Sequence, residues 1–102
     1  MNQEKKDFLT LVTLPARLGI TETAWFLGFT EHDVSALVST GLLKPLGHPP
    51  SSGSKYFSTS ELQVLRADGR WLAKASDAIV NHWKQKNAGR REKPDGRNVA
   101  AG

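Results

Sequence analysis

The sequence predicts a small, mainly α-helical domain that carries one short β-ribbon, and three observations lead to this fold class. Two glycines of the type that ends helices, Gly28 and Gly41, follow stretches of helical apolar periodicity. Thr30 and Ser58 each stand three residues before an acid, which is the signature of a helix N-terminus. Residues 42–57 hold a loop of Gly, Pro and Ser between two short apolar ends, which is typical of a ribbon with a long tip.

The ends of the chain are expected to lie outside the domain, which covers residues 15–87. Residues 1–14 predict an N-terminal arm: the polar residues 1–7 should fray, and the β-branched side chains of residues 8–14 favour an extended segment packed on the body. Residues 88–102 contain almost no large apolar side chain, so they predict a disordered basic tail.

Two helices joined by a very short turn form the first half of the domain. The first runs from about Ile20 to Gly28, with apolar residues spaced four and three apart. The second begins at Thr30, where Asp33 completes an approximate capping box, and ends at Gly41. Because only residues 28–30 separate them, the pair is a helix-turn-helix in the geometric sense.

The second half of the domain is predicted to be a ribbon followed by two helices. The ribbon spans about residues 43–57, and Ser58 with Glu61 then opens a short helix. The sequence Asp68-Gly69 breaks the chain before a last helix from about Arg70 to Asn87, whose stripe is Leu72, Ala75, Ile79 and Trp83. The three tryptophans, Trp25, Trp71 and Trp83, favour a core that the last helix closes. In the alternative, Trp71 or Trp83 lies on an exposed surface for dimerisation.

Composition and charge exclude several classes of function. Without cysteine the chain has no disulfide, thiolate nucleophile or Cys-ligated zinc. No apolar run approaches the roughly 20 residues of a membrane span, and residues 8–14 are a poor signal sequence, so we expect a soluble, cytoplasmic protein without a membrane partner. The net charge is +4, yet residues 15–83 carry six basic and six acidic side chains. The basic excess, which is typical of nucleic-acid binding, therefore belongs to residues 84–102.

The polar residues form no recognisable catalytic or metal-binding pattern. His32, His48 and His82 fall on three different predicted elements without metal-ligand spacing. No nucleophile and base can be paired by their spacing. The stretch from Gly47 to Lys55 has the wrong spacing for a phosphate-binding loop. The sequence thus predicts no enzyme, no metal site and no cofactor.

Residues 16–65 carry a set of features in a recognisable order: Ala24, the pair Leu27-Gly28, the cap Thr30, the core positions Val34 and Leu37, the turn 41–45, the segment 55–57, and Ser58 with Glu61-Leu62. In this order they resemble the winged helix-turn-helix domain of excisionase-type and MerR-type DNA-binding proteins. The resemblance implies that the second helix enters the major groove of DNA and that the ribbon contacts the backbone or the minor groove. It also implies a homodimer through the C-terminal helix.

The candidate DNA-binding residues follow from that resemblance and from the basic tail. They are Thr30, Glu31, His32, Ser35 and Ser39 in the second helix, Lys44, His48, Ser51, Ser52, Ser54 and Lys55 in the ribbon, and Arg90 and Arg91 in the tail. The second helix departs from the family pattern because residues 31–40 include no Arg, Lys, Asn or Gln, the usual contacts to bases and phosphates.

Two functions stay open at this point. In the first, the protein is a small DNA-binding transcriptional regulator or an excisionase-like architectural factor. In the second, the same scaffold is a protein–protein interaction module that reads no DNA. A continuous positive surface joining the ribbon, Arg17 and the tail favours the first, whereas a neutral apolar patch favours the second.

Overall fold

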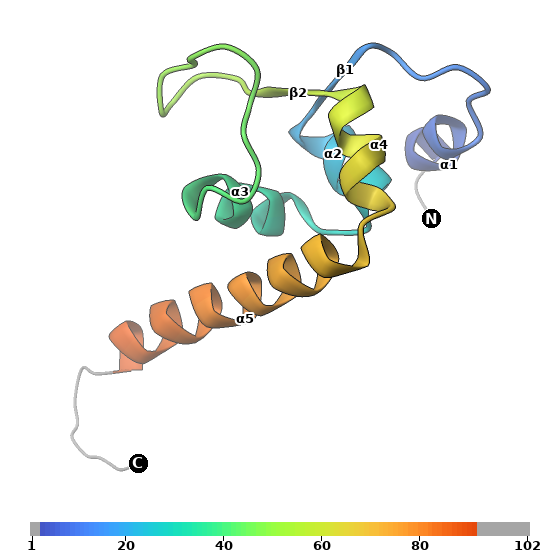
Figure 1. The fold of residues 1–102 in the computed structure, drawn as a ribbon. Coiled ribbons are helices and arrows are strands. Elements are labelled where there is room, and N and C mark those ends of the chain that lie inside the picture. The colour runs from blue at the N-terminus through green and yellow to red at the C-terminus, as the bar shows by residue number, and fades with distance from the viewer. Residues whose placement is uncertain (1–2, 92–102) are drawn as a thin grey trace.

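Five helices and a two-stranded sheet make up residues 3–91, the part of the chain that the computed structural model describes, with side chains as far as Asn87. In chain order they are α1 (Gln3–Leu9), β1 (Arg17–Gly19), α2 (Ile20–Leu27), α3 (Glu31–Ser39), β2 (Tyr56–Ser58), α4 (Thr59–Arg66) and α5 (Gly69–Arg91). Helices α2, α3 and α4 cluster below the sheet, and α5 runs past α3 and projects beyond the cluster (Figure 1). The mainly α-helical prediction is confirmed.

Helices α2 and α3 form the expected pair, and their ends are set by the residues that the sequence indicates. Gly28 adopts a left-handed conformation (φ 87°), and its N–H donates to the carbonyl of Ala24 over 2.9 Å. The hydroxyl of Thr30 accepts from the N–H of Asp33, and the Asp33 carboxylate accepts from the N–H of Thr30, both over 3.1 Å. This complete capping box fixes the start of α3.

The sheet corrects the predicted ribbon of residues 43–57. Strand β1 pairs antiparallel with β2, with Leu18 opposite Phe57, and residues 43–55 form a long loop without a strand. One backbone hydrogen bond, from the N–H of Leu46 to the carbonyl of Tyr56 (2.8 Å), ties this loop to β2. The prolines at 45, 49 and 50 lack the N–H that a ladder requires, whereas residues 17–19 offer a complete partner.

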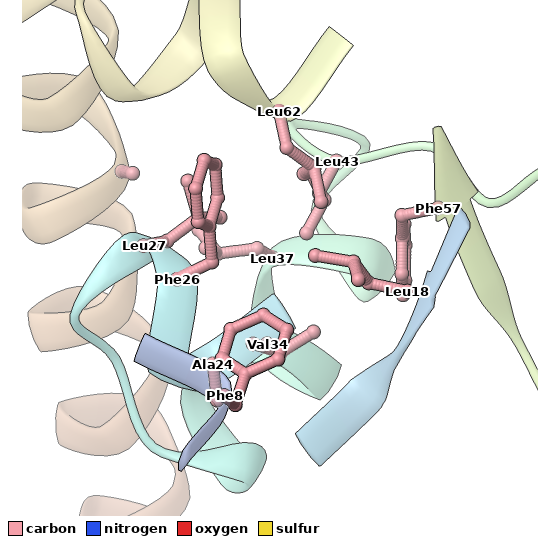
Figure 2. Packing of buried hydrophobic residues seen from close by; sticks show 11 residues of the cluster. Phe8, Leu18, Ala24, Phe26, Leu27, Val34, Leu37, Leu43, Phe57 and Leu62 are labelled. Atoms are coloured by element: carbon pink, nitrogen blue, oxygen red, sulfur yellow. The ribbon is translucent and has the colours of Figure 1, made fainter. Parts of the chain in front are cut away.

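The core lies between the sheet, α2, α3 and α4, and the inner faces of both strands contribute to it. Leu18 and Phe57 point from the two strands toward Leu37 of α3, with Leu62 of α4 above them (Figure 2). Val34 and Leu37 are completely buried, which confirms the apolar stripe of α3. Helix α5 adds a fully buried Ala75, and Trp25 and Trp71 pack against the cluster half-buried.

The N-terminal segment is helical over residues 3–9, where residues 1–7 were expected to fray and residues 8–14 to be extended. Residues 3–9 form α1, in which the side-chain amide of Gln3 donates to the Asp7 carboxylate one turn later (2.8 Å). Phe8 is buried, with its ring 5.7 Å from that of Trp25. Burial of this aromatic side chain against Trp25 anchors the short helix, and the β-branched residues that follow it lie outside the helix. Met1 and Asn2 lie outside the described residues.

Helix α5 is longer than predicted at its C-terminal end. The carboxylate of Asp68 accepts from the backbone N–H groups of Arg70 and Trp71 (3.0 and 3.2 Å), so the predicted break is a helix cap. The helix continues through Arg91. Residues 88–91 were predicted to belong to the disordered tail, and this prediction is wrong. The rest of the predicted tail, residues 92–102, lies outside the described residues.

Candidate nucleic-acid interface

The outward face of α3 is exposed, as the sequence predicts. Glu31, His32, Ser35 and Ser39 are all exposed, whereas the core side of the helix is buried through Val34, Ala36 and Leu37. Ser35 and Ser39 are one helical turn apart and therefore share a face. This face presents hydroxyl groups and carries no Arg or Lys of its own.

The two acids at the start of α3 hold the scaffold together. Asp33 closes the capping box with Thr30, so the hydroxyl of Thr30, itself a candidate contact, is engaged with backbone. The carboxylate of Glu31 accepts a hydrogen bond from the Thr21 hydroxyl over 3.0 Å. That bond ties the first turn of α3 to the first turn of α2. Both acids therefore have a structural role that does not require contact with a base.

His32 lies against α5, an arrangement that the sequence does not indicate. Its ring meets that of Trp83 edge-on, with centroids 6.3 Å apart. His82 also meets Trp83 edge-on at 5.1 Å, and Nζ of Lys86 lies 5.2 Å from the centroid of the same ring. Because Trp83 touches the first turn of α3, the basic turns at the end of α5 lie beside the N-terminal end of that helix.

The long loop supplies a second group of polar side chains at the other end of α3. Lys44, His48 and the three predicted serines, Ser51, Ser52 and Ser54, are exposed. Lys55 is half-buried, and its ammonium group donates to the carbonyls of Ser51 (3.0 Å) and Gly53 (3.4 Å). Lys55 thus fixes the loop tip, and Lys44 is the freely exposed cation of this segment.

The outer face of the sheet holds a feature absent from the predicted site. The guanidinium carbon of Arg17 lies 4.0 Å from the ring centroid of Tyr56, and both side chains are exposed. The two residues meet only because β1 pairs with β2. No local sequence signal connects residues so far apart, which is why the site prediction missed this contact.

The remaining candidates are dispersed or lie beyond the described side chains. Arg90 and Arg91 belong to the last turn of α5, and their side chains lie outside the described part of the chain.

The three histidines do not come together: His32 and His82 both contact Trp83, whereas His48 lies in the long loop. Within residues 3–87, no three His, Cys, Asp or Glu side chains gather as metal ligands would. None of the described helices has the length and apolarity to cross a membrane.

The protein is a small, mainly helical domain in which α2 and α3 form a helix-turn-helix and β1 and β2 form a two-stranded sheet. No protein-family model, no curated protein and no solved structure matches the chain.

Proposed function

We propose that this protein binds double-stranded DNA through the exposed face of α3, as a small transcriptional regulator or architectural factor. One observation carries the proposal: the exposed hydroxyl groups of Ser35 and Ser39 lie on a helix whose N-terminal end is beside the basic turns of α5 and whose C-terminal end leads to Lys44. Serine hydroxyls can contact phosphates and base edges, and exposed cations supply the attraction to the backbone. The major groove of B-DNA, about 12 Å wide, admits an α-helix.

The two cationic segments are placed by specific contacts. At the N-terminal end of α3, the meeting of His32 with Trp83 brings in the α5 turns that carry Lys84 and Lys86. At the C-terminal end, the chain leaves α3 and reaches the exposed Lys44 within one short turn. A duplex lying on α3 would have phosphates near both ends of the helix.

The charge distribution sets what kind of binding is expected. Helix α3 itself begins with two acids, which disfavour phosphate, so affinity has to come from the flanking cations. Contacts to phosphate fix the register of a protein on DNA without reading sequence. Sequence preference would then depend on the few hydroxyl groups of α3, and we expect it to be modest.

A direct test is selection of duplexes from a random pool by the full chain, followed by titration of the enriched and scrambled duplexes at two salt concentrations. The proposal expects enrichment of a short motif and an affinity that falls steeply as salt rises. Binding equally to all duplexes would remove the sequence-reading part of the proposal. An absence of binding at low salt would contradict the proposal altogether.

A second candidate function, a protein–protein interaction module, is favoured by a different surface. At the end of α1 and just after it, the chain exposes Leu9 (47%), Leu11 (49%) and Val12 (101%) within four residues. Clustered exposed apolar side chains are typical of a docking surface. In that case the double variant Leu11→Ser with Val12→Ser would lose binding to the partner protein and keep its stability. DNA binding by α3 is expected to be unchanged in the same variant.

We also propose that the protein forms a homodimer through α5, which sedimentation of the full chain tests.

A further inference from the structure

We infer that Arg17, held on the ring of Tyr56, contacts a DNA phosphate at the edge of the same interface. The inference rests on the proposed function and adds a contact from the sheet to those from α3. It starts from the 4.0 Å distance between the Arg17 guanidinium carbon and the Tyr56 ring centroid, and from the exposure of both side chains.

The pairing of the strands holds this arginine in place. Arg17 lies opposite Ser58, and Gly19 lies opposite Tyr56, so Arg17 and Tyr56 are diagonal neighbours on one face of the sheet. Because side chains alternate along a strand, Leu18 and Phe57 point to the other face and are buried. Leu18 and Phe57 anchor both strands in the core. Arg17 and Tyr56 therefore project from strands that are held in place.

Stacking on a ring leaves the hydrogen-bonding edge of a guanidinium available. Its planar N–H groups match the geometry of a phosphate and donate two parallel hydrogen bonds. Within residues 3–87, no carboxylate lies within ion-pair distance of Arg17. The tyrosine thus fixes the direction of the arginine without neutralising its charge, as an arginine that binds an anion requires.

The stack is continuous with the two other parts of the proposed interface. The backbone carbonyl of Tyr56 accepts from Leu46 in the long loop (2.8 Å), which joins the stack to the loop that carries Lys44. On the other side, β1 runs directly into α2, whose Thr21 donates to Glu31 at the start of α3 (3.0 Å). Arg17 therefore belongs to a strand pair that is tied to the long loop through Tyr56 and, through α2, to the first turn of α3.

Glu22 is an acid near enough to repel a phosphate bound to Arg17, and its replacement should therefore have the opposite effect to the replacement of Arg17. Oε1 of Glu22 would lie 3.1 Å from a Cβ placed on Gly19, and the edge of the Tyr56 ring would lie 3.9 Å from the same point. The Glu22 carboxylate and the ring on which Arg17 stacks therefore both flank Gly19. If a phosphate binds there, Glu22→Gln should tighten DNA binding, because it removes a repelling charge.

The experiment is a salt titration of DNA binding for the full chain and the variants Arg17→Gln, Arg17→Lys, Glu22→Gln and Lys6→Gln. Lys6 is an exposed lysine of α1, on the far side of the fold from α3, so Lys6→Gln removes the same charge as a control (Figure 1). Arg17→Gln should weaken binding and lower the slope of log K against log salt by about 0.9, the value for one phosphate that is no longer neutralised. Arg17→Lys should keep most of that slope and bind less tightly, and Lys6→Gln should bind as the wild type does.

Several outcomes would overturn the inference and leave the proposed function standing. If the Arg17→Gln protein has the melting temperature and the DNA affinity of the wild type, Arg17 packs on the outer face of the sheet and contacts no phosphate. Equal losses for Arg17→Gln and Lys6→Gln would show an effect of net charge without a specific contact. A change in the preferred DNA sequence of Arg17→Gln would assign the arginine to a base instead of a phosphate. If the wild type binds no duplex at low salt, the inference and the proposed function fall together.

Discussion

The ring of His32 on α3 meets the ring of Trp83 on α5 edge-on, at a centroid distance of 6.3 Å and an interplanar angle of 80°. Helix α5 contacts the core through the fully buried Ala75 and the half-buried Ile79, and beyond them the aromatic contact of Trp83 keeps its later turns beside α3. The basic end of the helix is thereby placed next to the proposed DNA-binding face.

Replacing Trp83 by Ala should loosen the end of α5. Because the side chain is half-buried, we expect a loss of about 1–2 kcal/mol in the free energy of unfolding, less than for a fully buried tryptophan. Amide hydrogen exchange should accelerate in residues 80–87 and stay slow in α2. DNA affinity should fall with it, because Lys84 and Lys86 are no longer held beside α3. Unchanged exchange in residues 80–87 would show that Trp83 does not hold the helix.

Leu37→Ala should destabilise the fold strongly, since Leu37 is completely buried in the centre of the core (Figure 2). Emptying such a position costs about 2–5 kcal/mol, which denaturant titration measures. Ser35→Ala, on the exposed face of the same helix, is the matched control and should change stability by less than about 0.5 kcal/mol. Similar stabilities for the two variants would contradict the assignment of the buried face.

Thr23→Val should stabilise the protein. The Thr23 hydroxyl is completely buried and has no hydrogen-bond partner among the described residues, so removing it relieves an unsatisfied polar group. We expect a gain of about 1 kcal/mol in thermal or denaturant unfolding. Thr59→Val is the contrasting variant: Thr59 is also buried, but its hydroxyl donates to the carbonyl of Pro15, so this change should destabilise. A loss of stability in both variants would show that the Thr23 hydroxyl is satisfied.

The end of α2 and the starts of α3 and α4 were predictable because their signals lie within four residues. Thr30 with Asp33 and the left-handed Gly28 behave as the sequence indicates. Ser58 likewise accepts from the N–H of Glu61 (3.4 Å). The apolar stripe of α3 followed from periodicity in the same way.

Contacts between distant segments were not predictable. The pairing of β1 with β2 joins segments about 40 residues apart, and no sequence feature of one segment points to the other. Strands of three residues are also too short to show the alternation of apolar and polar residues that identifies a strand. Helix α1 depends on the burial of Phe8 against Trp25, a tertiary contact that overrides local preference. For the same reason, the exposure of Glu31, His32, Ser35 and Ser39 on α3 was predictable, but the Arg17–Tyr56 stack and the place of His32 beside Trp83 depend on packing and were not.

Removal of residues 88–102 should weaken DNA binding without changing sequence preference. The deletion removes four cations, Arg90, Arg91, Lys93 and Arg97, together with two acids. The salt slope should fall by roughly 0.9 for each phosphate that these cations neutralise in the full chain, and the ratio of affinities for preferred and scrambled duplexes should persist. A slope equal to that of the full chain would show that these residues do not bind phosphate.

Ser35→Ala with Ser39→Ala should have the reverse effect. Both hydroxyls are exposed on the face proposed to enter the groove, and neither carries charge. We expect the preference between the two duplexes to relax while the salt slope stays unchanged. If discrimination between duplexes survives in the double variant, another part of the surface reads the sequence.

The binding of DNA on α3, between the long loop and the end of α5, is tested most directly by NMR. Amide shifts of the full chain would be followed while a selected duplex is titrated in. We expect the largest changes at Ser35, Ser39, Lys44 and the turn around Trp83, with small changes in α1. Shifts concentrated at residues 9–12, with α3 unaffected, would contradict DNA binding by this face.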